Sequence, residues 1–169
     1  MQIRRETPDD YEEVYALIME AFASAEHADG TEQDLTAALR KSAAFIPELS
    51  LVAEANGRLA GHILFTKITI GGREALALAP LSVRPEYQRQ GVGTALMDEG
   101  HRIAKELGYS YSVVLGSERY YPRFGYVPAE RFGIVVPEGV PSINFMARKL
   151  REDAGPMNGP VCYAKEFGM

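Results

Sequence analysis

The segment from residue 81 to residue 96 joins the end of an apolar strand, a loop of hydrogen-bond donors and the start of a helix. It reads Leu-Ser-Val-Arg-Pro-Glu-Tyr-Gln-Arg-Gln-Gly-Val-Gly-Thr-Ala-Leu. Gly91 and Gly93 lack a Cβ, so the backbone there can turn tightly and lie against a ligand. The first N–H groups of a helix have no internal partners, and the helix dipole is positive at that end. With the charge of Arg89 added, this pattern predicts a cradle for a phosphate or pyrophosphate.

Three kinds of phosphate site use a loop of this type. A P-loop needs Lys followed by Ser or Thr after its last glycine, and Gly93 is followed by Thr94 without a lysine. A dinucleotide-binding fold needs Gly-x-Gly-x-x-Gly directly after its strand. Here Leu96 stands in place of the third glycine, and Pro85 lies in the loop that separates the strand from the first glycine. The remaining candidate is an acyltransferase that binds coenzyme A.

The elements expected around this loop indicate an α/β fold of the mixed α+β type. The continuous apolar run over 75–83 is typical of a central strand that is covered on both faces. Pro80 cannot donate a hydrogen bond to a neighbouring strand, so it predicts a bulge or a splayed neighbour. The expected strands are 2–6, 49–55, 58–70, 75–83, 109–115, 143–150 and 161–163, and the expected helices are 7–22, 31–41 and 92–107.

The loop resembles the signature of the GNAT superfamily of N-acetyltransferases, which reads Gln/Arg-x-x-Gly-x-Gly/Ala. Gln88, Gly91 and Gly93 match it, and the resemblance extends over most of the chain. It is greatest to a bacterial subfamily of small, mostly uncharacterised members. These carry Leu-Ala-Pro-Leu before the loop and Tyr-Tyr-x-Arg-Phe-Gly after the next strand, found here at 78–81 and 120–125.

The resemblance implies one N-acetyltransferase domain over residues 1–169. Its central mixed sheet would have about six or seven strands flanked by helices, with a splay between the strands at 75–83 and 109–115. The enzyme would transfer an acetyl group from acetyl-CoA, its co-substrate, to an amine by direct attack in a ternary complex, without a metal.

The same resemblance implies which residues hold the co-substrate. Backbone groups of Leu81 and Val83 would bind the pantetheine arm, and the N–H groups over 89–94 would bind the pyrophosphate. Tyr121, four residues before Gly125, would protonate the departing thiolate; the alternative is a core aromatic with a solvated hydroxyl. The cofactor-binding residues expected are Leu81, Ser82, Val83, Gln88, Arg89, Gln90, Gly91, Val92, Gly93, Thr94, Ser117 and Tyr121.

The general base is not identified by the sequence. Some family members use a glutamate on the strand before the loop, but residues 75–83 contain no carboxylate. The candidates are a water chain or one of three glutamates that are otherwise surface charges, namely Glu118, Glu54 and Glu32. Of the histidines, His62 is expected in the core or on the surface, and His101 is expected to be exposed.

The bulk composition restricts the class of protein. Apolar residues make up 46% of the 169 residues, charged residues make up 24%, and the net charge is −5. The composition is typical of a globular protein, and the negative net charge argues against a general nucleic-acid binder. The single cysteine, Cys162, excludes an intrachain disulfide and clusters of the Cys-x-x-Cys type. No apolar run approaches membrane-spanning length, so we expect a cytoplasmic protein without a membrane partner. Dimers are common enough among soluble proteins that a homodimer is expected.

The acceptor is expected to be a small-molecule or peptide amine. The segments expected around it are 24–34, 66–74 and 116–145, and Glu26, Asp29 and Glu32 in the first would suit a cation. Two other functions remain open: a non-catalytic acyl-CoA-binding or sensing module on the same fold, and, less favoured, a nicotinamide-dependent enzyme.

Overall fold

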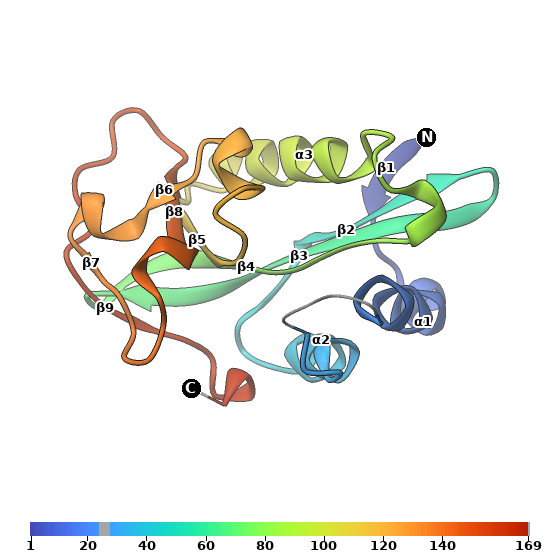
Figure 1. Ribbon diagram of the computed structural model, residues 1–169, viewed down its shortest axis with the longest axis horizontal. Helices are drawn as coiled ribbons and strands as arrows, with labels where there is room; N and C mark the ends of the chain where they lie inside the picture. Colours follow the sequence, from blue (N-terminus) through green and yellow to red (C-terminus); the bar gives the residue numbers. More distant parts are fainter. Residues whose placement is uncertain (24–27, 169) are drawn as a thin grey trace.

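The computed structural model describes residues 1–23 and 28–168 and arranges them around one sheet (Figure 1). The strands and α-helices, in chain order, are β1 (Gln2–Arg5), α1 (Tyr11–Phe22), α2 (Glu32–Arg40), β2 (Phe45–Ala55), β3 (Arg58–Ile70), β4 (Arg73–Val83), α3 (Val92–Glu106), β5 (Tyr111–Leu115), β6 (Val127–Pro128), β7 (Ile134–Val135), β8 (Phe145–Lys149) and β9 (Gly159–Cys162). Single 3-10 turns lie at Pro8–Asp10, Pro85–Tyr87, Tyr121–Phe124, Ala129–Phe132, Ser142–Asn144 and Lys165–Phe167.

Within the described chain, seven strands follow one another across the sheet in the order β1-β2-β3-β4-β5-β8-β6. Strand β9 pairs with the end of β3 and with β7. The neighbours β4 and β5 run parallel, whereas the other neighbours along the main path run antiparallel. This confirms the predicted mixed sheet. The very short strands β6 and β7 are additions that the sequence pattern did not indicate.

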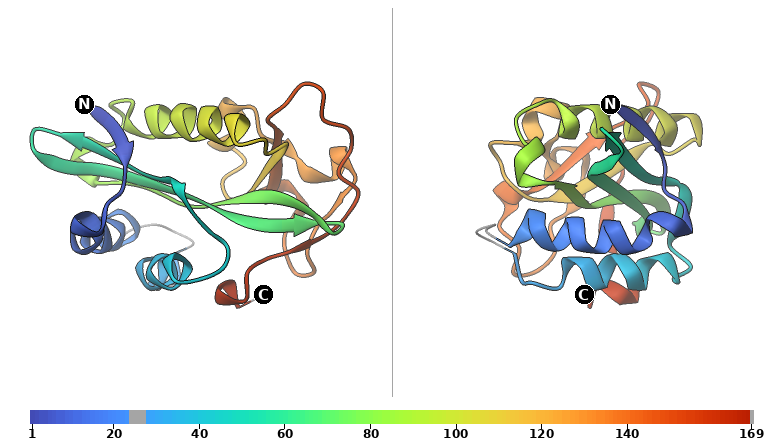
Figure 2. Two further views of the ribbon diagram at one scale, coloured as in Figure 1. Left: turned by 180° about the vertical axis from the view of Figure 1, so that it is seen from behind. Right: turned by 90° about the vertical axis from the view of Figure 1, so that its right-hand side faces the viewer.

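Helix α3 covers one face of the sheet, and α1 and α2 lie together on the other face (Figures 1 and 2). Leu96 and Met97 of α3 belong to one buried cluster with residues of β2, β3 and β4. The opposite face carries a separate cluster in which Leu17 and Ile18 of α1 pack with Val52 of β2. Burial of these apolar stripes accounts for the layered order, because each helix has only one apolar side to hide.

Strands β4 and β5 meet only briefly. Their pairing consists of Leu76 with Ser112 and Ala77 with Val113. Just beyond it, β4 has two residues, Ala79 and Pro80, between its paired residues Leu78 and Leu81, where β3 has only Leu64. This one-residue bulge contains Pro80 and confirms the prediction made from that proline. Past the bulge β4 has no pairing to β5 in the described chain, so the two strands separate toward their carboxyl ends. The region between these ends is called the slot below.

Candidate active site

The open edge of β4 forms one side of this slot. Arg84 donates its N–H to a carbonyl of β3 at 2.9 Å. Because backbone groups along a strand alternate between its two edges, those of Ser82 also face β3. The groups of Leu81 and Val83 therefore face the slot. The side-chain amide of Gln88 donates to the Val83 carbonyl at 3.2 Å, which ties the following loop to this edge.

The loop after β4 ends in an open helix N-terminus. Gly91 is the residue before α3 and has a left-handed backbone with φ of 85°. Arg89 is also left-handed, with φ of 62°. The Ala95 N–H makes the first bond of the helix, to the Gly91 carbonyl at 3.0 Å, so the N–H groups ahead of it have no partner in the helix. This end of α3 can therefore bind an anion.

The side chains of the loop divide into two groups. Arg89, Gln90 and Thr94 are exposed, and the Gln90 amide donates to the Glu86 carbonyl at 2.9 Å. Val92 is only 4% exposed and packs in the core below α3, so its backbone alone is available to a ligand. The sequence pattern predicted all of these positions to bind the cofactor, and it did not indicate which side chains are exposed and which lie in the core.

Tyr120 and Tyr121 close the slot from the other side. A Cβ added to Gly93 would lie 2.6 Å from the Tyr120 hydroxyl, so the missing side chain at Gly93 leaves room for this tyrosine over the start of α3. The rings of Tyr120 and Tyr121 pack edge to face, with 5.1 Å between centroids. A Cβ on Gly116 would collide with the Tyr121 ring. Tyr121 thus lies beside the end of β5.

The chemistry of Tyr121 follows from its surroundings. Burial raises the pKa of its phenol, and the neighbouring Tyr120 raises that pKa further. The phenol is therefore protonated at neutral pH and is able to donate its proton or a hydrogen bond.

Ser117 and Ser82 have structural surroundings that the sequence did not indicate. The Ser117 hydroxyl accepts the Arg119 N–H at 3.1 Å, and the Ser117 carbonyl accepts those of Tyr120 and Tyr121, both at 3.2 Å. Ser117 therefore builds the turn that carries the two tyrosines. Ser82 is 1% exposed and its backbone faces β3, so it lies away from the open edge.

A buried hydrogen-bond network lies behind Tyr121. Arg148 on β8 donates through one Nη1 atom to the Phe124 carbonyl at 2.8 Å and to His101 Nδ1 at 2.9 Å. His101 Nε2 then donates to the Tyr126 hydroxyl at 2.9 Å, and this hydroxyl donates to Ser112 at 2.8 Å. The network therefore connects α3, β5 and β8 to the 3-10 turn that contains Tyr121.

The prediction that His101 is exposed is wrong. The residue is 5% exposed, because Tyr126 and Arg148 from later segments cover its side of α3. Burial, followed by the charge of Arg148, lowers the pKa of His101 to about 3. His101 is therefore neutral near pH 7 and acts as a hydrogen-bond bridge.

A second buried network surrounds His62 on the other face of the sheet. Arg40 of α2 forms an ion pair with Glu6 at 2.6 Å. The Ser50 hydroxyl donates to Glu6 at 2.7 Å and lies 3.1 Å from His62 Nε2. Since the only hydroxyl proton goes to Glu6, His62 Nε2 must be the donor to Ser50. Burial lowers the pKa of His62 to about 4.

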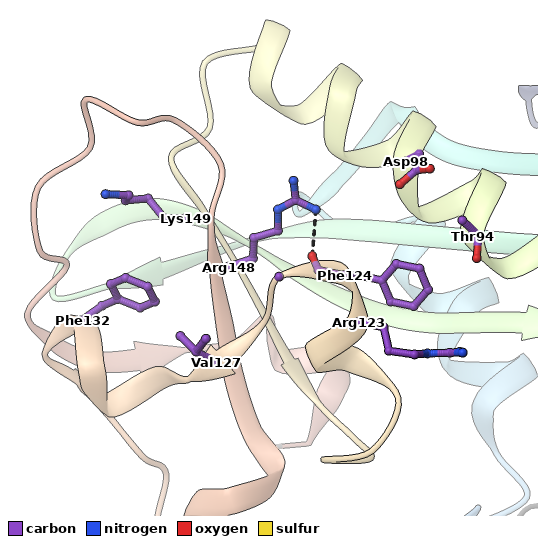
Figure 3. A pocket seen from close by; sticks show the side chains of 9 residues that line it. Thr94, Asp98, Arg123, Phe124, Val127, Phe132, Arg148 and Lys149 are labelled. Carbon is purple, nitrogen blue, oxygen red and sulfur yellow. Dashed lines mark hydrogen bonds between the residues drawn. The ribbon is translucent and has the colours of Figure 1, made fainter.

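An open cavity of about 670 Å³ adjoins the start of α3 (Figure 3). Thr94 and Asp98 project from α3 toward it, while Arg148 rises from β8 beneath them. Its lining includes three cationic side chains, those of Arg123, Arg148 and Lys149. Positive side chains of the cavity therefore lie next to the open N-terminus of α3.

The three glutamates considered as general bases lie in different places. Glu54 pairs with Arg4 at the β1–β2 edge, at 3.0 Å, and Glu32 accepts the Asp29 N–H at the start of α2. Glu118 follows the end of β5, where Asn144 donates to it at 2.8 Å. Among the three, Glu118 is the one placed beside the slot. Glu26, expected near the acceptor, lies outside the described residues.

Two further findings concern the described residues alone. No group of three or more His, Cys, Asp or Glu side chains among them is arranged to hold a metal ion. None of their helices is both long and apolar enough to cross a bilayer.

Comparisons with known proteins agree with this geometry. The model of the acetyltransferase (GNAT) domain family matches residues 2–129. The uncharacterized N-acetyltransferase YhbS of Escherichia coli K12 is 30% identical over 171 aligned positions, covering 99% of this chain and 98% of YhbS. The uncharacterized N-acetyltransferase YjhQ of the same organism is 43% identical over 101 residues, which cover 57% of this chain and 56% of YjhQ.

Two solved structures are similar over nearly the whole chain. A GNAT family acetyltransferase from Brucella melitensis in complex with acetyl-CoA is 32% identical, with a TM-score of 0.81, and the match covers 98% of this chain and 97% of that one. The YhbS structure from Escherichia coli in complex with CoA is 29% identical, with a TM-score of 0.89 and coverage of 99% and 92%.

The splayed sheet, the open helix N-terminus and these matches define the class of enzyme as an acetyl-CoA-dependent N-acetyltransferase. The chain belongs to the GNAT acetyltransferase family.

Proposed function

We propose that this enzyme acetylates an amine by direct attack on bound acetyl-CoA in a ternary complex, with Tyr121 as the acid. One observation carries the proposal. The free edge of β4 at Leu81 and Val83 leads into an open helix N-terminus, and Tyr121 lies across the slot beside Gly116. The strand edge could therefore bind the pantetheine arm, the helix N-terminus could bind the pyrophosphate, and Tyr121 would lie near the thioester. Residues 1–169 would act as one domain, since the sheet includes both β1 and β9.

Each part of the slot has a distinct role in binding acetyl-CoA. The amide groups of the pantetheine arm would add to the free edge of β4 as a further strand does. The pyrophosphate would bind the N–H groups over 89–94, where the helix dipole and Arg89 favour negative charge. The cavity beside Thr94 would receive the phosphorylated ribose, because Arg123 and Lys149 on its wall are cations.

The transfer needs one attack and two proton movements. The amine nitrogen forms a bond to the thioester carbon, the carbon–sulfur bond breaks, and sulfur leaves with the electron pair. Transfer of a proton from a free tyrosine to a free thiolate is uphill by about 2 kcal/mol. The main contribution of Tyr121 is therefore a hydrogen bond that strengthens as charge develops on sulfur.

Substitution of Tyr121 tests the proposal directly. Tyr121→Phe keeps the ring that packs on Gly116 and removes the proton donor. We expect kcat for thiol release to fall by about 100-fold or more while the Kd for acetyl-CoA is unchanged. Tyr163→Phe, far along the chain, is the matched control. Turnover close to wild type in Tyr121→Phe would remove this tyrosine from the mechanism.

Ligand binding tests the slot itself. In a thermal shift experiment, acetyl-CoA and CoA should each raise Tm, because a ligand at 100 times its Kd stabilises the fold by about 2.7 kcal/mol. NADH should not. A rise with acetyl-CoA but no thiol release with any amine would favour the sensing module instead.

A further inference from the structure

Arg148 belongs both to the open cavity and to the hydrogen-bond network behind Tyr121. Its guanidinium lines the cavity beside the start of α3 (Figure 3) and also bonds to the 3-10 turn that contains Tyr121. We propose that Arg148 binds the 3′-phosphate of acetyl-CoA and thereby links occupation of the co-substrate site to the position of Tyr121. The inference rests on the proposed function and adds to it a residue that holds the acid in place when the complete co-substrate is bound.

Only one side of the Arg148 guanidinium is used by the protein. Its Nη1 atom donates to the Phe124 carbonyl at 2.8 Å and to His101 Nδ1 at 2.9 Å. The Nε and Nη2 atoms make no hydrogen bond to any of the described residues, and the edge that carries them faces away from the Phe124 carbonyl (Figure 3). Two N–H groups on one edge of a guanidinium match two oxygens of a phosphate, so this edge can bind one.

The cavity lies where the 3′-phosphate would be. Thr94 and Asp98 are one helical turn apart on α3, about 6 Å along its axis, and Arg148 lies beneath them (Figure 3). The cavity therefore begins at the open helix N-terminus and extends past Arg148. In acetyl-CoA the phosphorylated ribose follows the pyrophosphate directly. A pyrophosphate bound at residues 89–94 would thus direct the 3′-phosphate into this cavity.

The charge of the cavity favours an anion. Its lining includes three cationic side chains, those of Arg123, Arg148 and Lys149, and one acidic side chain, that of Asp98. Arg123, Lys149 and Asp98 are exposed, whereas Arg148 is half-buried. Because water screens exposed charges more than buried ones, the half-buried guanidinium should contribute most to the binding of a phosphate.

Arg148 contacts the end of the turn that contains Tyr121. This 3-10 turn spans Tyr121–Phe124, and its last carbonyl accepts the bond from Arg148. A Cβ added to Gly125, the next residue, would lie 3.5 Å from both Cδ and Nε of Arg148, so the arginine lies across the end of the turn. A phosphate that fixes the guanidinium would therefore also fix the backbone three residues after Tyr121.

A second connection reaches the ring of Tyr121. His101 accepts from Arg148 and donates to the Tyr126 hydroxyl at 2.9 Å. The Tyr126 ring packs on that of Tyr121, with 5.9 Å between centroids. Binding energy from a remote part of the co-substrate would thus be used to position the acid, which is a general way in which enzymes raise kcat.

A comparison of CoA with dephospho-CoA, which lacks only the 3′-phosphate, tests the proposal without an acceptor. By calorimetry, CoA should bind the wild type about 10- to 100-fold more tightly, because hydrogen bonds between charged groups are the stronger ones. Hydrogen exchange then measures the turn, through the N–H groups of Arg123 and Gly125, which bond to carbonyls within residues 120–122. At saturation, CoA should slow their exchange by about tenfold more than dephospho-CoA does.

Variants of Arg148 identify the residue responsible. Arg148→Gln should bring the two Kd values to within about threefold of each other and remove the difference in exchange. Arg148→Lys keeps the charge but not the planar fork, so it should retain part of the difference in Kd and lose the difference in exchange. Arg151→Gln is the matched control, because Arg151 does not line the cavity, and it should retain both differences. The comparison in the wild type does not depend on how well these variants fold.

Four outcomes are decisive. Equal Kd values for CoA and dephospho-CoA in the wild type would overturn phosphate binding in the cavity. A difference in Kd without a difference in exchange would overturn the link to Tyr121. A difference in Kd that persists in full in Arg148→Gln would assign the phosphate to another cation and overturn the role of Arg148. Absence of binding of both ligands to the wild type would instead overturn the proposed function.

Discussion

Two buried histidines lie on opposite faces of the sheet and differ in how their ring nitrogens are satisfied. His101, on the α3 face, accepts from Arg148 at Nδ1 and donates to Tyr126 at Nε2. His62, on the face of α1 and α2, is bonded to Ser50 at Nε2, and within the described residues its Nδ1 has no hydrogen-bond partner. Both rings are buried, and burial is the main cause of the lowered pKa in each.

The two histidine networks also hold different parts of the molecule in place. The His101 network reaches the Phe124 carbonyl and Tyr126, whose ring packs near Tyr121 at 5.9 Å, so it holds the proposed acid. The His62 network joins α2 to the sheet through Arg40 and Glu6. A buried polar network that is fully satisfied makes the structure around it rigid, whereas an unpaired buried polar group is costly. We therefore expect the residues that touch the His101 network to be held more rigidly than those that touch the His62 network.

The largest expected effect is on stability in acid, and both histidines contribute. Each has a folded-state pKa, about 4 for His62 and about 3 for His101, below the ordinary value of 6.5. At pH values between the lowered pKa and 6.5, each histidine is protonated in the unfolded chain and neutral in the folded one. The free energy of unfolding should therefore fall as pH drops below 6.5, by about 1.4 kcal/mol per pH unit for each histidine. Urea unfolding at neutral pH and at about pH 5.5 measures this slope.

Two glutamine variants separate the contributions. His101→Gln can still accept from Arg148 and donate to Tyr126, and His62→Gln can still donate to Ser50, but neither titrates. Each should remove about half of the histidine-dependent slope. An unchanged slope in either variant would show that the corresponding ring is charged in the folded state.

The next effect in size is expected at Tyr126. Tyr126→Phe keeps the ring but removes the bonds that His101 Nε2 and the Ser112 hydroxyl make, and each buried group left unsatisfied costs about 1–3 kcal/mol. The variant should lose stability in urea unfolding, and kcat should fall because the support of Tyr121 is loosened. Tyr15→Phe, whose hydroxyl bonds to Asp34 on the surface, should lose much less. Equal losses in the two variants would show that the His101 network contributes no more to stability than an exposed hydrogen bond.

The smallest effect is expected from a matched pair of serines. Ser112 and Ser82 are 0% and 1% exposed, on the α3 face and the His62 face respectively. The hydroxyl of Ser112 bonds to Tyr126, whereas among the described residues that of Ser82 has no partner. Ser112→Ala should cost about 1 kcal/mol or more, and Ser82→Ala should be close to neutral. A large cost at Ser82 would reveal a partner outside the described residues.

Much of the fold could be predicted because its signals are local. The bulge at Pro80 and the helix start at Gly91 depend on residues within one short segment, and the structure has both. The roles of Leu81, Val83 and Tyr121 came from the resemblance to a family, and the structure gives each a position at the slot. The burial of His101 was missed because the pattern of α3 alone does not show which later segments cover it.

The sequence by itself determined the strand, loop and helix over 75–107, the mixed sheet, the open helix N-terminus after Gly91 and the class of enzyme. Backbone preferences of glycine and proline and the periodicity of apolar residues act over a few positions, so they can be read in order along the chain. Only the tertiary structure decided that Asn144 would hold Glu118 and that Arg148 would reach His101. These partners are 26 and 47 residues apart, and such contacts depend on how β8 packs beside β5.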